Sequence, residues 1–148
     1  MRKKMLFICV HNSARSQMAA AFVNEKCGEF LEAQSAGLEP GVLNPMVVEA
    51  LQEVGVDISQ NRTQAVFDVW KGGTLFSHVV TVCSEADAAG CPIFPGPATR
   101  LHWPFDDPSK FIGTHEERLA QTRRVRDQIR AKVEGFCAEH CGSASTSA

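Results

Sequence analysis

Short apolar runs recur along the chain, separated by longer segments in which apolar residues return every three or four positions. The first run, KMLFIC, is almost unbroken, which is typical of a strand buried on both faces of a parallel sheet. A later run, HVVTV, is rich in β-branched residues, which favour strands. The pattern predicts four strands, at residues 4–9, 31–36, 78–82 and 101–103.

The segments between these runs have the spacing of amphipathic helices, at residues 16–27, 45–54, 65–71 and 116–140. Pro45 suits the first turn of the second helix, with Asn44 as its cap, and Gly55 ends it. Strands that alternate with helices predict an α/β domain, a four-stranded parallel sheet with helices on both faces. We expect this single domain to span residues 1–141 and a disordered polar tail to follow at 142–148.

The composition and charge of the chain argue against several classes of function. The 148 residues are 44% hydrophobic and 22% charged, as in ordinary globular proteins. A net charge of −2 and a pI near 6.2 argue against nucleic-acid binding. No apolar run approaches the ~20 residues of a membrane span, and the apolar run after the first lysines is too short for a signal peptide. We therefore expect a cytoplasmic protein that binds neither nucleic acid nor membrane. We also expect a monomer, although nothing in the composition determines the oligomeric state.

Six cysteines stand at positions 9, 27, 83, 91, 137 and 141. In a reducing compartment permanent disulfides are not expected, so catalysis, redox cycling, metal binding and packing are the alternatives. The absence of a CxxC pair weakens a zinc or thioredoxin-like interpretation. Cys27 is expected to be a core residue, and packing is favoured for Cys137 over a metal site with His140 and Cys141. We predict no metal site.

The loop after the first strand has the composition of an anion cradle. It reads CVHNSARS, and a helix follows at once, so free backbone N–H groups and the helix dipole favour a tetrahedral oxyanion there. Arg15 can clamp two oxygens of that anion, and the positive potential favours the thiolate of Cys9. The alternative is that Cys9 is only a buried strand-end residue. The predicted anion-binding residues are Val10, His11, Asn12, Ser13, Ala14, Arg15 and Ser16.

This loop resembles the CX5RS loop of the low-molecular-weight tyrosine phosphatase superfamily. The resemblance extends to Ser35-Ala36-Gly37 and to Asp107-Pro108, and covers residues 4–138. It implies the phosphatase-like fold, with Cys9 as nucleophile, Arg15 as anion clamp and Asp107, rather than Asp106, as general acid.

One branch of the superfamily fits better. The segment VVTVCSEADAAGCP, followed by HWPFDDP, resembles the thioredoxin-coupled arsenate reductases, which add two redox cysteines to the phosphatase core. The resemblance implies that Cys9 attacks arsenate, that Cys83 then attacks Cys9 and releases arsenite, and that Cys91 takes over the disulfide with Cys83. Thioredoxin would be the external reductant, with no bound cofactor.

Two other functions stay open. One is a protein phosphatase that uses Cys9, Arg15 and Asp107, with Cys83 protecting the nucleophile from over-oxidation. The other is a non-catalytic thiol sensor or arsenite-binding module. Aromatic residues usually follow the Asp-Pro of phosphatases, whereas Ser109-Lys110 follow here, and the chain has no tyrosine.

Two residues depart from the family pattern. His11 occupies a loop position often held by glycine, so we expect it to strain the backbone or to add a donor near the anion. Ala20 stands where many relatives have a glutamate that belongs to a potassium site in some reductases, which argues against monovalent-cation dependence here.

The residues between Cys83 and Cys91 are compatible with a short helix. Eight helical steps of ~1.5 Å would hold the two Cα atoms roughly 12 Å apart, whereas a disulfide needs about 4.4–6.8 Å. The sequence therefore predicts that residues 84–90 unwind when the disulfide forms.

Overall fold

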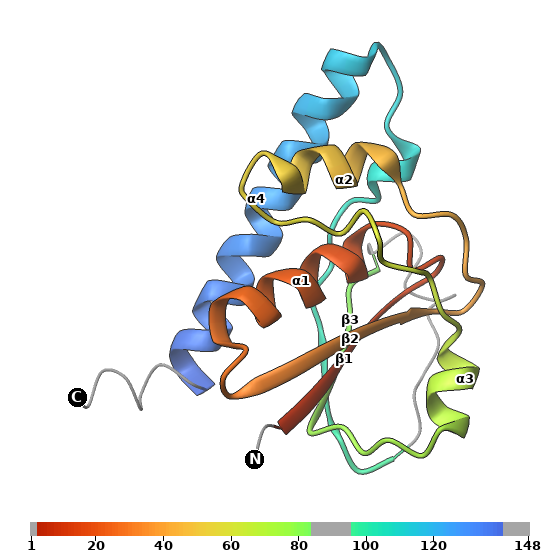
Figure 1. Ribbon diagram of the computed structural model, residues 1–148, viewed down its shortest axis with the longest axis vertical. Coiled ribbons are helices and arrows are strands. Elements are labelled where there is room, and N and C mark those ends of the chain that lie inside the picture. The colour runs from red at the N-terminus through yellow and green to blue at the C-terminus, as the bar shows by residue number, and fades with distance from the viewer. Residues whose placement is uncertain (1–2, 84–95, 141–148) are drawn as a thin grey trace.

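The computed structural model describes residues 3–83 and 96–140, and its elements follow the predicted order (Figure 1). Each predicted strand and helix is present, with ends that differ by one or two residues. A short 3-10 turn after Asp107 was not predicted. The elements are β1 (Lys3–Cys9), α1 (Arg15–Cys27), β2 (Leu31–Gly37), α2 (Pro45–Gln52), α3 (Val66–Lys71), β3 (His78–Thr81), β4 (Thr99–His102), the 3-10 turn η2 (Pro108–Lys110) and α4 (His115–His140).

The strands form one parallel sheet in the order β2-β1-β3-β4, which confirms the predicted fold class. The chain leaves the central β1 to one side, forms β2, and then crosses back to form β3 on the other side. In parallel sheets, ligands bind beyond the carboxyl ends of the strands where the order reverses in this way. The end of β1 at Cys9 lies at this position.

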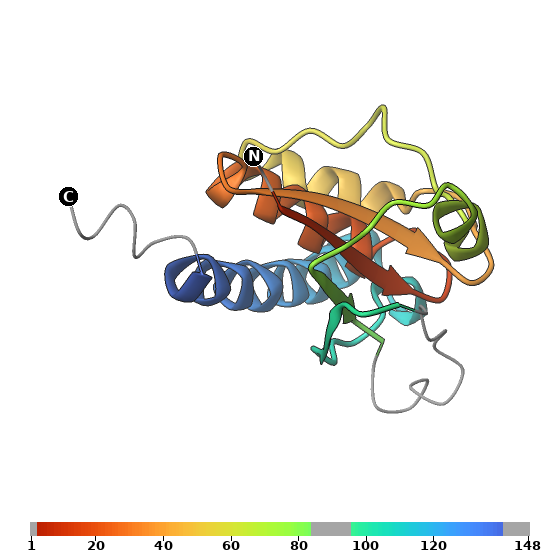
Figure 2. The same cartoon turned by 90° about the horizontal axis from the view of Figure 1, so that it is seen from below.

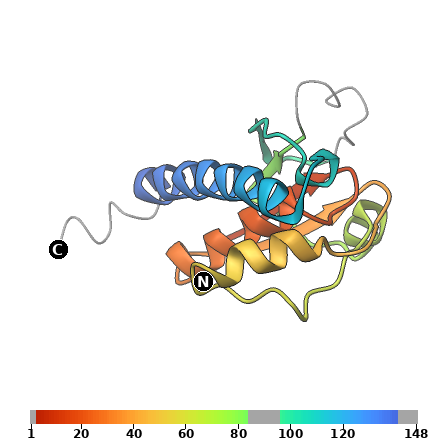
Figure 3. The same ribbon diagram turned by 90° about the horizontal axis from the view of Figure 1, so that it is seen from above.

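Both faces of β1 are buried, as its unbroken apolar run predicts. Met5 and Phe7 pack into the larger core, which also holds apolar residues of α1 and α4. Leu6 and Ile8 face the other side and pack into a smaller core with α3. The helices α1, α2 and α4 lie together on one side of the sheet, and α3 lies apart from them (Figures 2 and 3). The sheet is therefore covered on both faces.

The caps follow local chemistry. The side chain of Asn44 accepts hydrogen bonds from the backbone N–H groups of Met46 and Val47, and so caps α2 as predicted. No described helix has the length and apolarity that a membrane span requires.

A disulfide joins Cys27, at the end of α1, to Cys137 in the last turns of α4, with their Cα atoms 6.0 Å apart. Both residues are buried, as expected, but the sequence pattern predicts only packing for them and no bond between them. The bonded Cys137 is not a thiolate ligand, which removes it from the metal site considered with His140 and Cys141. The expectation that these cysteines would not be bonded is wrong for this pair, because α1 and α4 pack against each other.

Several expectations concern residues outside the described ranges. They are the redox role of Cys91, the helix at 84–90 and its unwinding, the role of Cys141, and the polar tail at 142–148.

Candidate active site

Cys9 is the last residue of β1, and α1 begins at Arg15, so the cysteine loop joins a strand end directly to a helix N-terminus. Cys9 is buried and is the free thiol among the described cysteines. Its Sγ lies 3.0 Å from Ser16 Oγ, in the first turn of α1. The strand thus places the sulfur where the helix dipole favours negative charge.

The loop carbonyls face outward onto the segment 38–44. The carbonyl oxygens of Val10, His11 and Ser13 accept hydrogen bonds from that segment at 2.8, 2.9 and 2.9 Å. In a trans peptide the N–H points away from the C=O, so the N–H groups that follow these carbonyls point to the opposite side, away from the segment. The loop N–H groups are therefore available on the side away from the segment, as a loop that binds a tetrahedral oxyanion requires.

Asn12 holds the loop in a left-handed conformation, with φ of 55°. The strained position is therefore Asn12 rather than His11, which differs from our expectation, and asparagine tolerates this conformation better than most residues. The ring of His11 is instead held at 3.0 Å by the carbonyl of Glu39.

The hydrogen bonds of Asn12 also orient the Cys9 contact. Its Oδ1 accepts from the backbone N–H of Gln64 at 2.9 Å, which leaves Nδ2 to donate to Ser16 Oγ at 2.8 Å. Because Ser16 Oγ accepts that bond, its own hydrogen is available to Cys9 Sγ. A hydroxyl that donates to sulfur stabilises the thiolate, the nucleophilic form.

Arg15 and Asp107 form an ion pair at the mouth of the loop. Arg15 Nη2 lies 3.4 Å from Asp107 Oδ2, and both side chains are largely buried. Arg15 Nη1 donates to the carbonyl of Phe105 at 3.1 Å, and Asp107 Oδ1 accepts from the backbone N–H of Ser109 at 2.9 Å. The structure thus brings Asp107 to the Cys9 loop, although it follows Cys9 by nearly a hundred residues.

Cys83 lies just beyond the end of β3, the strand that pairs with β1 on the side away from β2. The backbone N–H of Val82 donates to the carbonyl of Ile8 at 2.9 Å, so Cys83 follows β3 at nearly the level at which Cys9 ends β1. Cys83 is fully buried in the core cluster that contains Cys9, and its sulfur is disulfide-bonded. Cys9 therefore ends β1, and Cys83 follows the end of the neighbouring strand β3.

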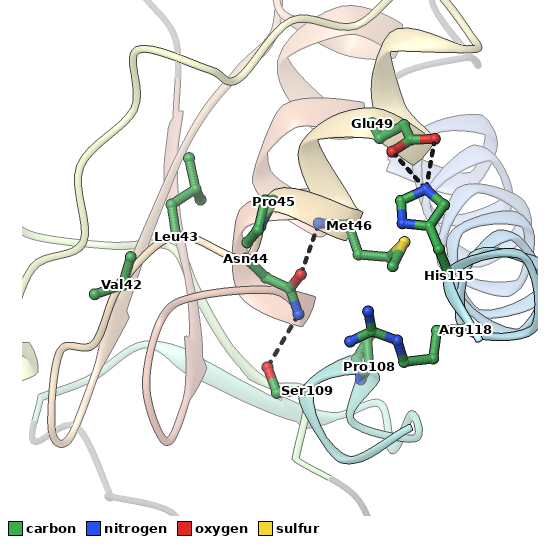
Figure 4. A pocket seen from close by; sticks show the side chains of 10 residues that line it. All are labelled: Val42, Leu43, Asn44, Pro45, Met46, Glu49, Pro108, Ser109, His115 and Arg118. Carbon is green, nitrogen blue, oxygen red and sulfur yellow. Dashed lines mark hydrogen bonds and ion pairs between the residues drawn. The ribbon is translucent and has the colours of Figure 1, made fainter. Parts of the chain in front are cut away.

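A hollow of about 390 Å³ adjoins the Asp107 side of the site (Figure 4). Asn44 Nδ2 donates to Ser109 Oγ at 3.1 Å across its floor. On the opposite wall His115 Nε2 lies 3.1 Å from Glu49 Oε1. Ser109 therefore gives the hollow a polar wall beside Asp107.

Gln17, in the first turn of α1, is buried behind the Cys9 loop. Its side-chain amide donates hydrogen bonds to the carbonyl oxygen and to Oδ1 of Asn12, at 3.1 and 3.4 Å. The expectation about monovalent cations that Ala20 raises stays a prediction. Sequence reasoning missed Gln17, because a glutamine inside a helical pattern gives no signal of its buried contacts.

The sequence pattern of the low molecular weight phosphotyrosine protein phosphatase family matches residues 4–141. The chain belongs to this family. The CX5RS loop, the parallel sheet and the Arg15–Asp107 pair described above are the features expected of a member.

Among the relatives of this family member is an arsenate reductase from Shouchella clausii, 43% identical over 92% of this chain and 96% of that protein. A solved arsenate reductase in a phosphate-binding state is 27% identical, with a TM-score of 0.71 over 93% of this chain and 98% of that one. A thioredoxin-dependent arsenate reductase from Corynebacterium glutamicum is 29% identical, with a TM-score of 0.58 over 90% of this chain and 62% of that one.

Proposed function

We propose that this protein reduces arsenate to arsenite with its own cysteine thiols, and that thioredoxin restores them. The observation that carries the proposal is the geometry around Cys9: a free sulfur hydrogen-bonded to Ser16 at 3.0 Å, in a loop whose carbonyls are turned outward onto the segment 38–44. Relatives named arsenate reductase support the choice of arsenate among tetrahedral oxyanions.

The first step forms a sulfur–arsenic bond. The Cys9 thiolate attacks arsenate, and one arsenate oxygen leaves as water after Asp107 supplies a proton. Arg15, 3.4 Å from Asp107, neutralises the oxyanion through its planar guanidinium. Arsenic is still pentavalent in this adduct.

The second step transfers two electrons to arsenic. The Cys83 thiolate attacks Cys9 sulfur, the electron pair of the sulfur–arsenic bond passes to arsenic, and arsenite leaves. Cys9 and Cys83 become a disulfide. Cys91 then attacks Cys83 and releases Cys9 as a thiolate, and a dithiol such as reduced thioredoxin reduces the Cys83–Cys91 disulfide.

The test is oxidation of NADPH in the presence of arsenate, thioredoxin and thioredoxin reductase. We expect sustained oxidation that depends on arsenate, and none with Cys9→Ser, because a serine hydroxyl does not ionise appreciably in the loop. Dithiothreitol in place of thioredoxin separates failure of the reductant from failure of the reaction. Turnover in Cys9→Ser, or no reduction with either dithiol, would contradict the proposal.

A phosphatase is the second candidate, because Cys9, Arg15 and Asp107 would also serve transfer of a phosphoryl group. A phosphotyrosine site would need an aromatic wall beside Asp107. The residue there is the polar Ser109, hydrogen-bonded to Asn44, which argues against such a site. Rapid hydrolysis of p-nitrophenyl phosphate, unchanged in Cys91→Ser and without arsenate turnover, would favour the phosphatase. Stoichiometric thiol oxidation by arsenate without turnover would favour a thiol sensor.

A further inference from the structure

Asn44 contacts three separate parts of the structure with three different groups. Its backbone N–H donates to the carbonyl of Ser13 in the Cys9 loop at 2.9 Å. Its Oδ1 accepts from two backbone N–H groups in the first turn of α2, at 2.8 and 3.4 Å. Its Nδ2 donates to Ser109 Oγ at 3.1 Å (Figure 4). Asn44 thus links the Cys9 loop, the start of α2 and the segment that carries Asp107.

The orientation of the Asn44 amide is determined by the helix. The N–H groups at the start of α2 can only donate, so the atom that faces them is the oxygen Oδ1. The NH₂ group then points to Ser109, whose hydroxyl oxygen accepts the hydrogen bond. The cap on α2 therefore sets the direction in which this amide reaches the Asp107 segment.

Asp107 is held between two contacts, one on each side of it in the sequence. Two residues before it, the carbonyl of Phe105 accepts from Arg15 Nη1 at 3.1 Å. Two residues after it, the hydroxyl of Ser109 binds Asn44. The backbone N–H of Ser109 also donates to Asp107 Oδ1 at 2.9 Å, while Oδ2 faces Arg15 at 3.4 Å. Ser109 therefore sets the position of the carboxyl group, and Asn44 holds Ser109.

These contacts form a closed ring around the mouth of the site. From Asn44 the ring runs through Ser109 and Asp107 to Arg15. It returns through the loop to Ser13, whose carbonyl binds the backbone of Asn44. Such a ring fixes the separation of two segments, which are the loop that carries the nucleophile and the segment that carries the acid.

We propose that Asn44 is a positioning residue that holds Asp107 at the Cys9 loop, within reach of the oxygen that leaves arsenate as water. A general acid acts only within hydrogen-bond reach of the atom that it protonates, so a small displacement of its carboxyl group slows the reaction. This inference rests on the proposed function for the role of Asp107 as the acid.

Two variants break the bridge between Asn44 and Ser109 from opposite ends. Asn44→Ser keeps a good cap for α2 and keeps the backbone N–H, but it has no amide that reaches Ser109. Ser109→Ala removes the acceptor and keeps the N–H that binds Asp107. We expect each variant to unfold at the same urea concentration as wild type. We expect each to lose about 10-fold in the single-turnover rate at which arsenate oxidises the reduced protein.

Binding of the anion should not change in these variants, because the loop N–H groups and Arg15 are untouched. The protection that phosphate gives to Cys9 against iodoacetamide should therefore equal that of wild type. The double variant Asn44→Ser/Ser109→Ala should lose no more than either single variant, because both changes remove the same hydrogen bond. A merely structural role for Asn44 would give losses that add.

Ser59→Ala is the matched control for the loss of a serine hydroxyl beside an aspartate. Ser59 follows Asp57 by two residues, as Ser109 follows Asp107, and its backbone N–H donates to Asp57 Oδ1 at 2.9 Å. It is exposed and lies in the loop between α2 and α3. We expect wild-type rates in this variant.

Aryl phosphates test the acid without arsenate. Phenolate is a poorer leaving group than p-nitrophenolate, so its departure depends more on a proton from Asp107. We expect Asn44→Ser and Ser109→Ala to lose more activity on phenyl phosphate than on p-nitrophenyl phosphate. A general loosening of the site would slow both reactions equally.

The two substrates separate this inference from the proposed function. If the wild-type protein does not reduce arsenate but the difference between the aryl phosphates appears, the proposed function fails and the role of Asn44 stands. Wild-type rates in both single variants, additive losses in the double variant, or equal losses on the two aryl phosphates would overturn the inference and leave arsenate reduction in place. A wild-type protein with neither activity would overturn both.

Discussion

At the scale of single residues, Arg15 makes contacts that depend on its planar guanidinium. It lies at the start of α1, donates to the carbonyl of Phe105 and pairs with Asp107 at 3.4 Å, while remaining 2% exposed. A lysine carries the same charge, but its ammonium cannot present two parallel donors to two oxygens.

We expect Arg15→Lys to lose most arsenate turnover and most protection of Cys9 by phosphate. Steady-state kinetics and alkylation rates measure the two effects. Arg130→Lys, on the far part of α4, is the control for a general effect of replacing arginine, and it should leave both unchanged. Near wild-type turnover in Arg15→Lys would remove Arg15 from the anion site.

Gly37, the last residue of β2, is required because the Cys9 loop lies directly against it. A Cβ there would be 2.7 Å from the backbone nitrogen of Asn12 and 2.8 Å from the carbonyl oxygen of Val10. Both are backbone atoms, so the loop itself would have to move. This is the physical reason for a glycine in the Ser-Ala-Gly sequence.

We expect Gly37→Ala to destabilise the protein by about 1–3 kcal/mol, as overpacking does, and to reduce turnover further than that loss of stability explains. Gly135→Ala is the opposite case, because a Cβ at Gly135 would meet nothing within 4 Å and the residue lies inside α4. It should stabilise the protein by about 0.5–1 kcal/mol. Urea denaturation measures both, and a neutral Gly37→Ala would contradict the close contact.

At the scale of elements, ion pairs connect α4 to the end of α2. Glu53, which caps the end of α2, accepts hydrogen bonds from Arg123 and Arg126 of α4. Arg126 is nearly buried and also donates to the carbonyl of Ala50 at 2.9 Å. The hydrogen bond from Arg123, with the charge of both arginines, lowers the pKa of Glu53 from 4.5 to about 2.

A lowered native pKa means that the unfolded chain binds the proton first as pH falls, so this contribution to stability is lost in acid. We expect the advantage of wild type over Glu53→Gln to be complete above pH 4.5 and to disappear as pH falls toward about 2. Urea denaturation across this range measures it. A stability gap between wild type and Glu53→Gln that stays constant with pH would contradict the ion pair.

The helices α1 and α4 are also joined, by the Cys27–Cys137 disulfide, which closes a loop across a sequence separation of 110 residues. A loop of this length restricts the unfolded chain strongly, so we expect the double variant Cys27→Ser/Cys137→Ser to lose about 2–5 kcal/mol of stability. Cys27 lies at the far end of α1, about 18 Å along the helix from Arg15, so arsenate turnover should be retained. Denaturation without reductant tests the first point, and loss of turnover at full folding would contradict the second.

At the scale of the whole molecule, the parallel order β2-β1-β3-β4 lets one crevice collect groups from distant parts of the chain. Cys9 ends β1, Cys83 follows the neighbouring β3, and Asp107 arrives from the segment after β4. The proposed relay needs this convergence, because each sulfur must reach the next.

We expect Cys91→Ser to reduce one arsenate per molecule and then stop, since Cys9 and Cys83 alone supply two electrons. Peptide mapping should find a Cys9–Cys83 disulfide, and dithiothreitol should restore further single turnovers. Sustained turnover of Cys91→Ser with thioredoxin would show that Cys91 is dispensable.

Local chemistry determined the elements and much of the site. The apolar run before Cys9, the Pro45 start of α2 and the cap at Asn44 depend on neighbours in sequence, so the pattern predicted them to within one or two residues. The loop composition likewise pointed to an anion site, because strand, loop and helix N-terminus are contiguous.

Only the tertiary structure decided the contacts between residues that are distant in sequence. No spacing rule pairs Cys27 with Cys137, places Arg62 opposite Gln17, or shows that Asn12 rather than His11 takes the strained conformation. These depend on which helix packs on which, and on hydrogen bonds from segments 38–44 and 61–64 that have no periodic pattern. The residues that form the loop around Cys9 are therefore contiguous in the sequence. The contacts that hold this loop in place come from distant segments that the fold brings together.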